Sequence, residues 1–103
     1  MSHEWQVYII LSSDNQLYTG ITTDIERRWR EHTRGKAGAR YFRGRTPAQL
    51  CYLETGHDRS SASQREAAIK KLSRAQKNTL IASRPRPTQP GTADMPTAEA
   101  VAG

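Results

Sequence analysis

The chain has 103 residues, of which 35% are hydrophobic and 25% charged, and these values predict one globular domain with one modest core. No apolar run approaches the roughly 18 residues that a membrane span needs, and no secretory signal is recognisable, so we expect a cytoplasmic protein without a membrane partner. The net charge of +6 favours a polyanionic partner, and the single cysteine, Cys51, excludes an internal disulfide and is expected to be buried.

The first half of the chain predicts a β-hairpin followed by a helix. Residues 5–11 and 16–22 are rich in β-branched and aromatic residues, and the Ser-Asp-Asn between them is typical of a turn. Thr23 and Glu26 have the spacing of a capping box, so a helix is expected from there to about Arg34. Residues 35–47 contain three glycines and one proline and predict a loop.

The second half predicts a strand, two helices and a tail. Residues 48–54 form a mostly apolar run, as expected of a buried strand. The serines of residues 60–63 begin a second helix to about residue 72, and Ser73 with Gln76 forms a capping box for a third helix over 74–82. From Arg84 onward, prolines with Thr, Ala and Gly predict a disordered tail, residues 84–103, after a domain spanning 1–83.

The order strand, strand, helix, strand, helix, helix predicts an α+β fold. A three-stranded antiparallel sheet flanked by helices is the economical way to bury the apolar side chains of these elements. The expected core consists of Val7, Ile9, Leu17, Trp29, Leu50, Tyr52, Ile69 and Leu72.

Four side chains capable of acid–base or phosphate chemistry lie in the first three elements. Tyr8 and Tyr18 are in the two hairpin strands, so their hydroxyls can reach one site if the strands pair near them. Arg28 and His32 are four residues apart in the helix and therefore neighbours on one face. Together they provide a hydroxyl pair, an imidazole and a guanidinium, to which Glu66 adds a carboxylate.

Each of these residues also has a structural interpretation. A tyrosine in a strand usually serves packing, and a single helical histidine is usually structural or on the surface. Arg28 can pair with Glu31 or Glu26 as surface charge, and Glu66 can complete a capping box with Ser63.

The loop is a candidate nucleic-acid-binding segment. Its cations alternate with aromatic residues and glycines, and cations contact phosphate while aromatic rings stack on unpaired bases. The alternative is a solvated loop whose aromatic residues turn inward. The expected contacts are Lys36, Arg40, Tyr41, Arg43 and Arg45, extended by Lys70 of the second helix.

Taken together, these residues resemble the GIY-YIG nuclease superfamily over about residues 4–82. The first motif falls on Gln6-Val7-Tyr8 and the second on Tyr18-Thr19-Gly20, so Gln6 replaces a glycine and Thr19 departs at the middle position. The stretches 18–24 and 70–77 look most similar to the compact, single-domain bacterial members of the YhbQ type. The family's helix arginine, helix histidine and metal-binding glutamate fall on Arg28, His32 and Glu66.

The resemblance implies a metal-dependent endonuclease that hydrolyses DNA phosphodiester bonds, in DNA repair or processing. Tyr8 would be the general base, helped by adjacent cations and supported by Tyr18. Arg28 would stabilise the charge on the phosphate, and His32 could accept the tyrosine proton. Glu66 would hold one divalent ion, Mg²⁺ or Mn²⁺.

The expected partner is nucleic acid, DNA more than RNA, bound by a monomer or a weak dimer. Many relatives use an asparagine at the offset of Asn78, although here it falls in the third helix. A non-catalytic nucleic-acid-binding module with the same fold, or a small adaptor protein, are the alternative hypotheses.

Overall fold

The computed structural model describes residues 4–34 and 46–90, which form three strands and three helices. In chain order these are β1 (Trp5–Ser12), β2 (Leu17–Thr22), α1 (Ile25–Arg34), β3 (Pro47–His57), α2 (Arg59–Lys70) and α3 (Arg74–Ala82). The α+β class and the order of elements predicted from the sequence are confirmed. The capping box expected at the start of α3 is also present.

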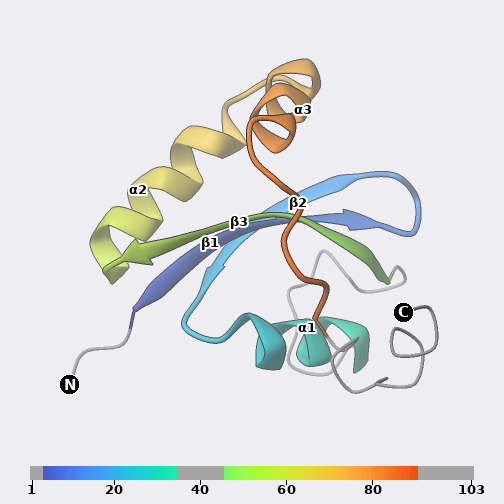
Figure 1. Ribbon diagram of the computed structural model, residues 1–103, viewed down its shortest axis with the longest axis horizontal. Helices are drawn as coiled ribbons and strands as arrows, with labels where there is room; N and C mark the ends of the chain where they lie inside the picture. Colours follow the sequence, from blue (N-terminus) through green and yellow to red (C-terminus); the bar gives the residue numbers. More distant parts are fainter. Residues whose placement is uncertain (1–3, 35–45, 91–103) are drawn as a thin grey trace.

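The strands form one antiparallel sheet in the order β2-β1-β3. Figure 1 shows α1 on one face of this sheet and α2 with α3 on the other. The sheet is therefore flanked by helices on both faces, as predicted. Within the described ranges, no helix is both long and apolar enough to cross a membrane.

The central strand β1 supplies side chains to both layers because successive residues of a strand point to opposite faces. Val7 and Ile9 are fully buried and pack with Tyr52 of β3 and with Ala62 and Ile69 of α2. This cluster joins the sheet to α2 and α3. Full burial of each large apolar side chain stabilises the fold by about 1.5–3 kcal/mol.

The opposite face of β1 forms a second apolar cluster with α1. Tyr8 and Ile10 are buried there together with Leu50 of β3, and Ile25 and Trp29 of α1 pack against them. Because Tyr8 belongs to this cluster, its polar hydroxyl is positioned by the same packing that attaches α1 to the sheet.

An extra residue in β3 allows that strand to serve both clusters. Tyr52 pairs with Ile9 whereas Leu50 pairs with Ile10, so Cys51 is inserted between two consecutive positions of β1. As a result Tyr52 faces α2 and Leu50 faces α1, although they are two positions apart in the strand and would otherwise share a face. Cys51 itself is 7% exposed, which confirms its predicted burial.

The start of α1 differs from the prediction by one residue. Asp24 rather than Thr23 caps the helix, since its carboxylate accepts the Arg27 N–H at 3.1 Å. Thr22 fixes this cap by accepting the Asp24 N–H at 3.1 Å. A charged acceptor at this position is favoured because it faces the positive end of the helix dipole.

The start of α2 also differs, because β3 continues to His57. Asp58 caps the helix in a reciprocal capping box, accepting the Ser61 N–H at 2.7 Å and donating its own N–H to the Ser61 hydroxyl at 3.1 Å. The alternative capping box of Ser63 with Glu66 is therefore wrong, since both residues already lie inside α2.

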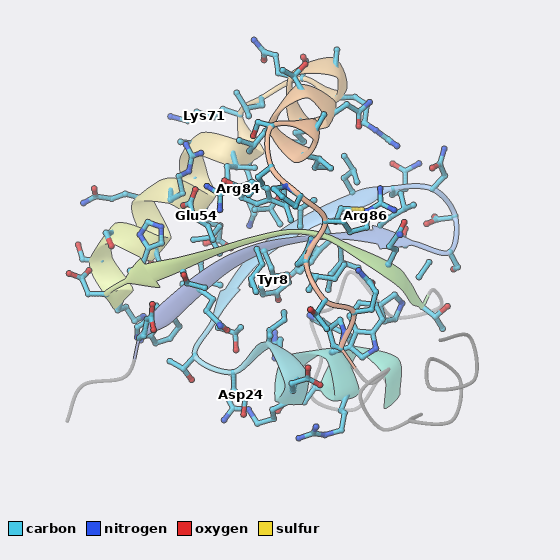
Figure 2. The ribbon with its side chains drawn as sticks, in the orientation of Figure 1. Tyr8, Asp24, Glu54, Lys71, Arg84 and Arg86 are labelled. Carbon is cyan, nitrogen blue, oxygen red and sulfur yellow. The ribbon has the colours of Figure 1, made fainter. Side chains whose placement is uncertain are left out.

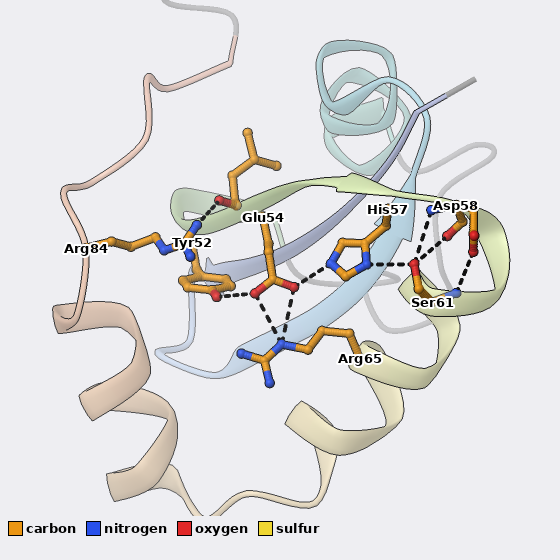
Figure 3. A network of polar contacts seen from close by, with 8 residues as sticks. Tyr52, Glu54, His57, Asp58, Ser61, Arg65 and Arg84 are labelled. Carbon is orange, nitrogen blue, oxygen red and sulfur yellow. Dashed lines mark hydrogen bonds and ion pairs between the residues drawn. The ribbon is translucent and has the colours of Figure 1, made fainter. Parts of the chain in front are cut away.

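A polar cluster fastens the end of β3 to α2 (Figure 3). Glu54 accepts hydrogen bonds from the Tyr52 hydroxyl at 2.7 Å and from Arg65 Nε at 3.2 Å, and His57 Nε2 lies 2.6 Å from it. Burial raises the pKa of Glu54, but these hydrogen bonds and the charge of Arg65 bring that pKa below its usual range. His57 Nδ1 continues the chain of contacts to Ser61 at 2.9 Å.

Residues 84–90, called here the edge segment, lie along the outer edge of β3. Gln89 accepts the Leu50 N–H at 2.7 Å and donates to the Leu50 carbonyl at 2.8 Å, as a neighbouring strand would. Arg84 donates to the Leu53 carbonyl at 3.2 Å, and its guanidinium lies 5.0 Å from the centre of the Tyr52 ring. In Figure 1 the segment runs from α3 across β3 toward α1.

The edge segment is the first part of the predicted tail, residues 84–103. Residues 84–90 form no helix or strand, and polar side chains attach the segment to β3. Composition reports the lack of apolar residues and does not detect such bonds. The division into a domain of residues 1–83 and a disordered tail stays a prediction. Residues 91–103 lie outside the described residues.

Gln89→Ala is expected to lower the free energy of unfolding by about 1 kcal/mol, because it leaves the Leu50 N–H and C=O to water at the sheet edge. Urea denaturation measures this change. Thr88→Ala, at an exposed neighbouring position, is the matched control. Equal stability of the two variants would contradict the edge-binding role of Gln89.

Candidate active site

The hairpin register brings the two tyrosines to the same face of the sheet. Tyr8 is opposite Gly20 and Ile10 is opposite Tyr18, so the tyrosines are diagonal neighbours. Their ring centres lie 6.2 Å apart with the planes at 44°. Figure 2 shows Tyr8 between the sheet and α1. The convergence of the two hydroxyl-bearing rings that the sequence predicted is observed.

Gly20 is required because the ring of Tyr8 lies directly over it. A Cβ atom at residue 20 would be 2.5 Å from the Tyr8 hydroxyl oxygen and 2.7 Å from its Cζ, and 3.1 Å from Tyr18. These separations are shorter than van der Waals contact. The glycine of the second motif therefore makes room for the tyrosine of the first.

The helix α1 places His32 against both tyrosines. His32 is 1% exposed, and its Nε2 lies 3.1 Å from the Tyr8 hydroxyl oxygen. Its ring meets that of Tyr18 edge-on, with the centres 5.5 Å apart. A polar ring buried this deeply is held by tyrosines from two strands, so the three aromatic side chains form one packed unit.

Burial controls the protonation of this unit. It lowers the pKa of His32 to about 4, and the charge of Arg28 adds to that effect while Glu31 opposes it. Burial also raises the pKa of Tyr8; Tyr18 reinforces this shift, and Arg28 opposes it through hydrogen bonding and charge. At neutral pH both groups are therefore uncharged, and the phenol can donate to Nε2 when the ring carries its proton on Nδ1.

This protonation state corrects one expectation. The sequence predicted that adjacent cations, including His32, would help Tyr8 to lose its proton. His32 is not a cation at neutral pH, and burial outweighs the charge of Arg28, so the pKa of Tyr8 rises. The imidazole can still assist, as the acceptor of the tyrosine proton.

Arg28 stands beside the aromatic unit and is held by Glu31. Arg28 Nη1 lies 2.9 Å from Glu31 Oε1, and the two side chains are 26% and 29% exposed. Burial lowers the pKa of Arg28, but Glu31 and the hydroxyls of Tyr8 and Tyr18 outweigh it and raise the pKa. The guanidinium is therefore charged and fixed at the edge of the site. Of the two pairings that the sequence left open for Arg28, with Glu31 or with Glu26, the structure shows the pair with Glu31.

Glu66 makes no hydrogen bond or ion pair with Tyr8, Arg28 or His32 within the part of the chain that the structure describes. It lies in α2, on the stripe that also carries the buried Ile69, and pairs with Lys70 at 3.3 Å. Its catalytic role stays a prediction.

A divalent ion bound at Glu66 would need oxygen ligands from the protein, from water and from the substrate. Among the described residues, no three His, Cys, Asp or Glu side chains form a metal-binding group. Mg²⁺ commonly keeps several waters and takes one or two protein carboxylates together with substrate phosphate. A single carboxylate that is 24% exposed fits this requirement, provided that Lys70 releases it.

Most of the predicted nucleic-acid contacts cannot be placed relative to the tyrosines. Lys36, Arg40, Tyr41, Arg43 and Arg45 lie outside the described residues and stay predictions. Lys70 is 54% exposed at the end of α2, paired with Glu66. Asn78 is exposed on α3, the helix that covers the face of the sheet opposite α1.

Gln6 has a role that sequence reasoning missed. Its side-chain Oε1 accepts the Ile25 N–H at 3.1 Å and so attaches the first turn of α1 to β1. The residue that departs from the first motif thus helps to hold the helix that carries Arg28 and His32. No local spacing rule relates residues 19 positions apart, so only the folded chain reveals this contact.

The chain is similar to known proteins over most of its described residues. Residues 4–79 match the GIY-YIG catalytic domain. A UPF0213 protein of Desulfotalea psychrophila is 56% identical over 77 residues, which are 75% of this chain and 70% of that one. The UPF0213 protein YhbQ of Escherichia coli O8 is 45% identical over 78 residues, 76% of this chain and 77% of that one.

Two solved structures are also similar. The solution NMR structure of the UPF0213 protein BH0048 from Bacillus halodurans has 37% sequence identity and a TM-score of 0.51, covering 79% of this chain and 85% of that one. The solution NMR structure of EF2693 from E. faecalis has 35% identity and a TM-score of 0.55, covering 81% and 90%.

Gly20→Ala is expected to lower the free energy of unfolding by about 1–3 kcal/mol, because the added methyl group overpacks against the Tyr8 ring. In a Tyr8→Val background the same substitution should cost much less, since the ring is gone. Chemical denaturation of the four proteins in this double-mutant cycle measures the coupling. Equal costs in the two backgrounds would show that the ring is not the obstacle.

The pKa of about 4 for His32 predicts a loss of stability in mild acid. Between pH 6.5 and 4 the unfolded chain takes up a proton that the folded chain refuses, so stability falls by up to about 3 kcal/mol and then levels off. His32→Gln, which keeps an acceptor for Tyr8, should remove this part of the slope. Parallel pH dependences of the two proteins in denaturant titrations would rule out a neutral buried imidazole.

Proposed function

The chain belongs to the GIY-YIG family, and we propose that it hydrolyses phosphodiester bonds in nucleic acid, in DNA more readily than in RNA. The observation that carries the proposal is the 3.1 Å contact between the Tyr8 hydroxyl and His32 Nε2, beside Arg28. Hydrolysis needs a path for the proton of the attacking water and a partner for the charge on the phosphate. This buried neutral pair and the adjacent guanidinium supply both.

Tyr8 takes the proton from water and passes its own to His32. As the water oxygen bonds to phosphorus, the water proton moves to the Tyr8 oxygen while the phenolic proton moves to Nε2. This path avoids a free buried phenolate, which the raised pKa of Tyr8 makes unfavourable. Tyr18, edge-on to the imidazole, keeps the ring of His32 aligned with Tyr8.

Arg28 stabilises the negative charge that builds up on the phosphoryl oxygens. Its guanidinium is planar, always charged and able to donate several hydrogen bonds at once, which suits phosphate. The bond from phosphorus to the 3′ oxygen then breaks, that oxygen keeps the electron pair and takes a proton from solvent water, and the imidazolium of His32 returns its proton to solvent. The products are a 5′-phosphate and a 3′-hydroxyl.

Glu66 would hold one Mg²⁺ or Mn²⁺ ion, with water completing the coordination. When bound, such an ion supplies charge neutralisation at the phosphate and at the leaving oxygen. To bind the ion, Glu66 would give up its ion pair with Lys70. The released ammonium of Lys70 would then be available to a neighbouring phosphate.

The charge of the chain suggests its partner, and the resemblance to the family suggests the setting of the activity. A net charge of +6 on 103 residues favours a nucleic-acid partner. We assign the chain to DNA repair or processing in the cytoplasm, acting as a monomer or a weak dimer.

A non-catalytic nucleic-acid-binding module is the second candidate function. The ion pair of Glu66 with Lys70 favours it, because that carboxylate is neutralised without joining the tyrosines. Binding without cleavage, with an affinity that falls steeply as salt increases, would identify such a module.

Incubation with supercoiled plasmid tests the proposal. The plasmid should be nicked in the presence of Mg²⁺ or Mn²⁺ and should stay intact when EDTA removes the metal. Tyr8→Phe and Glu66→Ala should each lower the cleavage rate by about 100-fold or more, since one loses the proton path and the other the metal ligand. Glu26→Ala, on the exposed side of α1, is the matched control. Full activity in a folded Tyr8→Phe or Glu66→Ala protein would refute the assignment.

A further inference from the structure

We propose that Glu31 is a positioning residue for this hydrolysis, holding the Arg28 guanidinium beside the two tyrosines so that its remaining N–H groups are presented to the phosphate. The inference rests on the proposed function of the site. It concerns an acidic residue next to a site that must bind an anion, where repulsion of the substrate is the expected effect of a carboxylate.

The geometry of the ion pair supports positioning. Glu31 Oε1 contacts Nη1 of Arg28 at 2.9 Å, and the two residues are three positions apart on one helical face. A guanidinium has five N–H groups, so its contacts with Glu31 and with the Tyr8 hydroxyl still allow it to reach a phosphate. Glu31 therefore fixes the Nη1 side of the guanidinium and leaves the group able to contact phosphate.

Partial burial makes the contact more than a surface ion pair. Both side chains are less than one third exposed, whereas Arg27, the other cation near Glu31, is 52% exposed and lies 3.8 Å from the carboxylate. A free arginine side chain has about 2 kcal/mol of rotamer entropy to lose when it is fixed on the phosphoryl oxygens of the transition state. The contact with Glu31 reduces this loss before the substrate arrives.

Glu31 also offsets the positive charge of Arg28 beside the buried imidazole. The buried His32 lies against Tyr8 of β1 and Tyr18 of β2, and among the described residues the charged groups that shift its pKa are Arg28 and Glu31 of its own helix. Glu31 opposes the effect of Arg28 on the imidazole, so its removal would make His32 a poorer proton acceptor as well as releasing the guanidinium. Both consequences act on turnover rather than on substrate binding.

Kinetics of plasmid or oligonucleotide cleavage by Glu31→Ala and Glu31→Gln provide the first test. Glu31→Ala is expected to lower kcat by about tenfold or more without raising KM, because the arginine is misplaced while the site becomes more positive. Glu31→Gln keeps a hydrogen-bond acceptor and should recover part of the rate. Arg27→Gln removes the more distant partner and should leave kcat unchanged. A raised KM with unchanged kcat in Glu31→Ala would overturn the proposal.

A second measurement does not depend on activity. In the free protein, the NMR signal of the Arg28 Nε–H should indicate a guanidinium with restricted rotation, and Glu31→Ala should shift this signal toward that of a more mobile group. An unchanged Arg28 signal would overturn the positioning role even in an active enzyme. Absence of cleavage by the unsubstituted protein, with the Arg28 signal still dependent on Glu31, would instead refute the proposed function alone.

Discussion

The burial of the Tyr8 hydroxyl is the constraint on which the rest of the site depends. The phenol must pass over a residue without a Cβ atom, and Gly20 provides that position directly opposite in the hairpin. Its oxygen then needs a polar partner away from water, and His32 of α1 supplies one at 3.1 Å. One side chain therefore links both strands of the hairpin to the helix, and burial in the same layer keeps the imidazole neutral.

The same arrangement explains why the sheet has two chemically different faces. β1 alternates between an apolar layer under α2 and the tyrosine layer under α1, and the inserted Cys51 lets β3 follow that alternation. The aromatic unit, Arg28 and Glu31 belong to the α1 face, whereas Glu66 belongs to the helix on the other face. The proposed hydrolysis thus depends on how the α2 carboxylate, now paired with Lys70, combines with groups of the α1 layer.

Polar side chains also complete the fold where apolar burial ends. Glu54 of β3 contacts Tyr52 and His57 of the same strand and accepts a hydrogen bond from Arg65 of α2, which attaches the strand to the helix. Gln89 accepts the Leu50 N–H at the outer edge of β3. An exposed strand edge can pair with another chain, so a side chain that occupies its hydrogen-bonding groups protects a small domain from self-association. The edge segment belongs structurally to the sheet although its composition resembles that of a linker.

The sequence by itself determined the order of elements, the α+β class and the identity of the tyrosine, arginine and histidine positions, because hydrophobic periodicity, capping residues and motif spacing are local properties. The reason for Gly20, the neutral state of His32, the bond from Gln6 to α1 and the attachment of Gln89 to β3 were decided by the tertiary structure. Each depends on burial or on contacts between residues distant in the chain. Local patterns report neither the desolvation that shifts a pKa nor the close approach that requires a glycine.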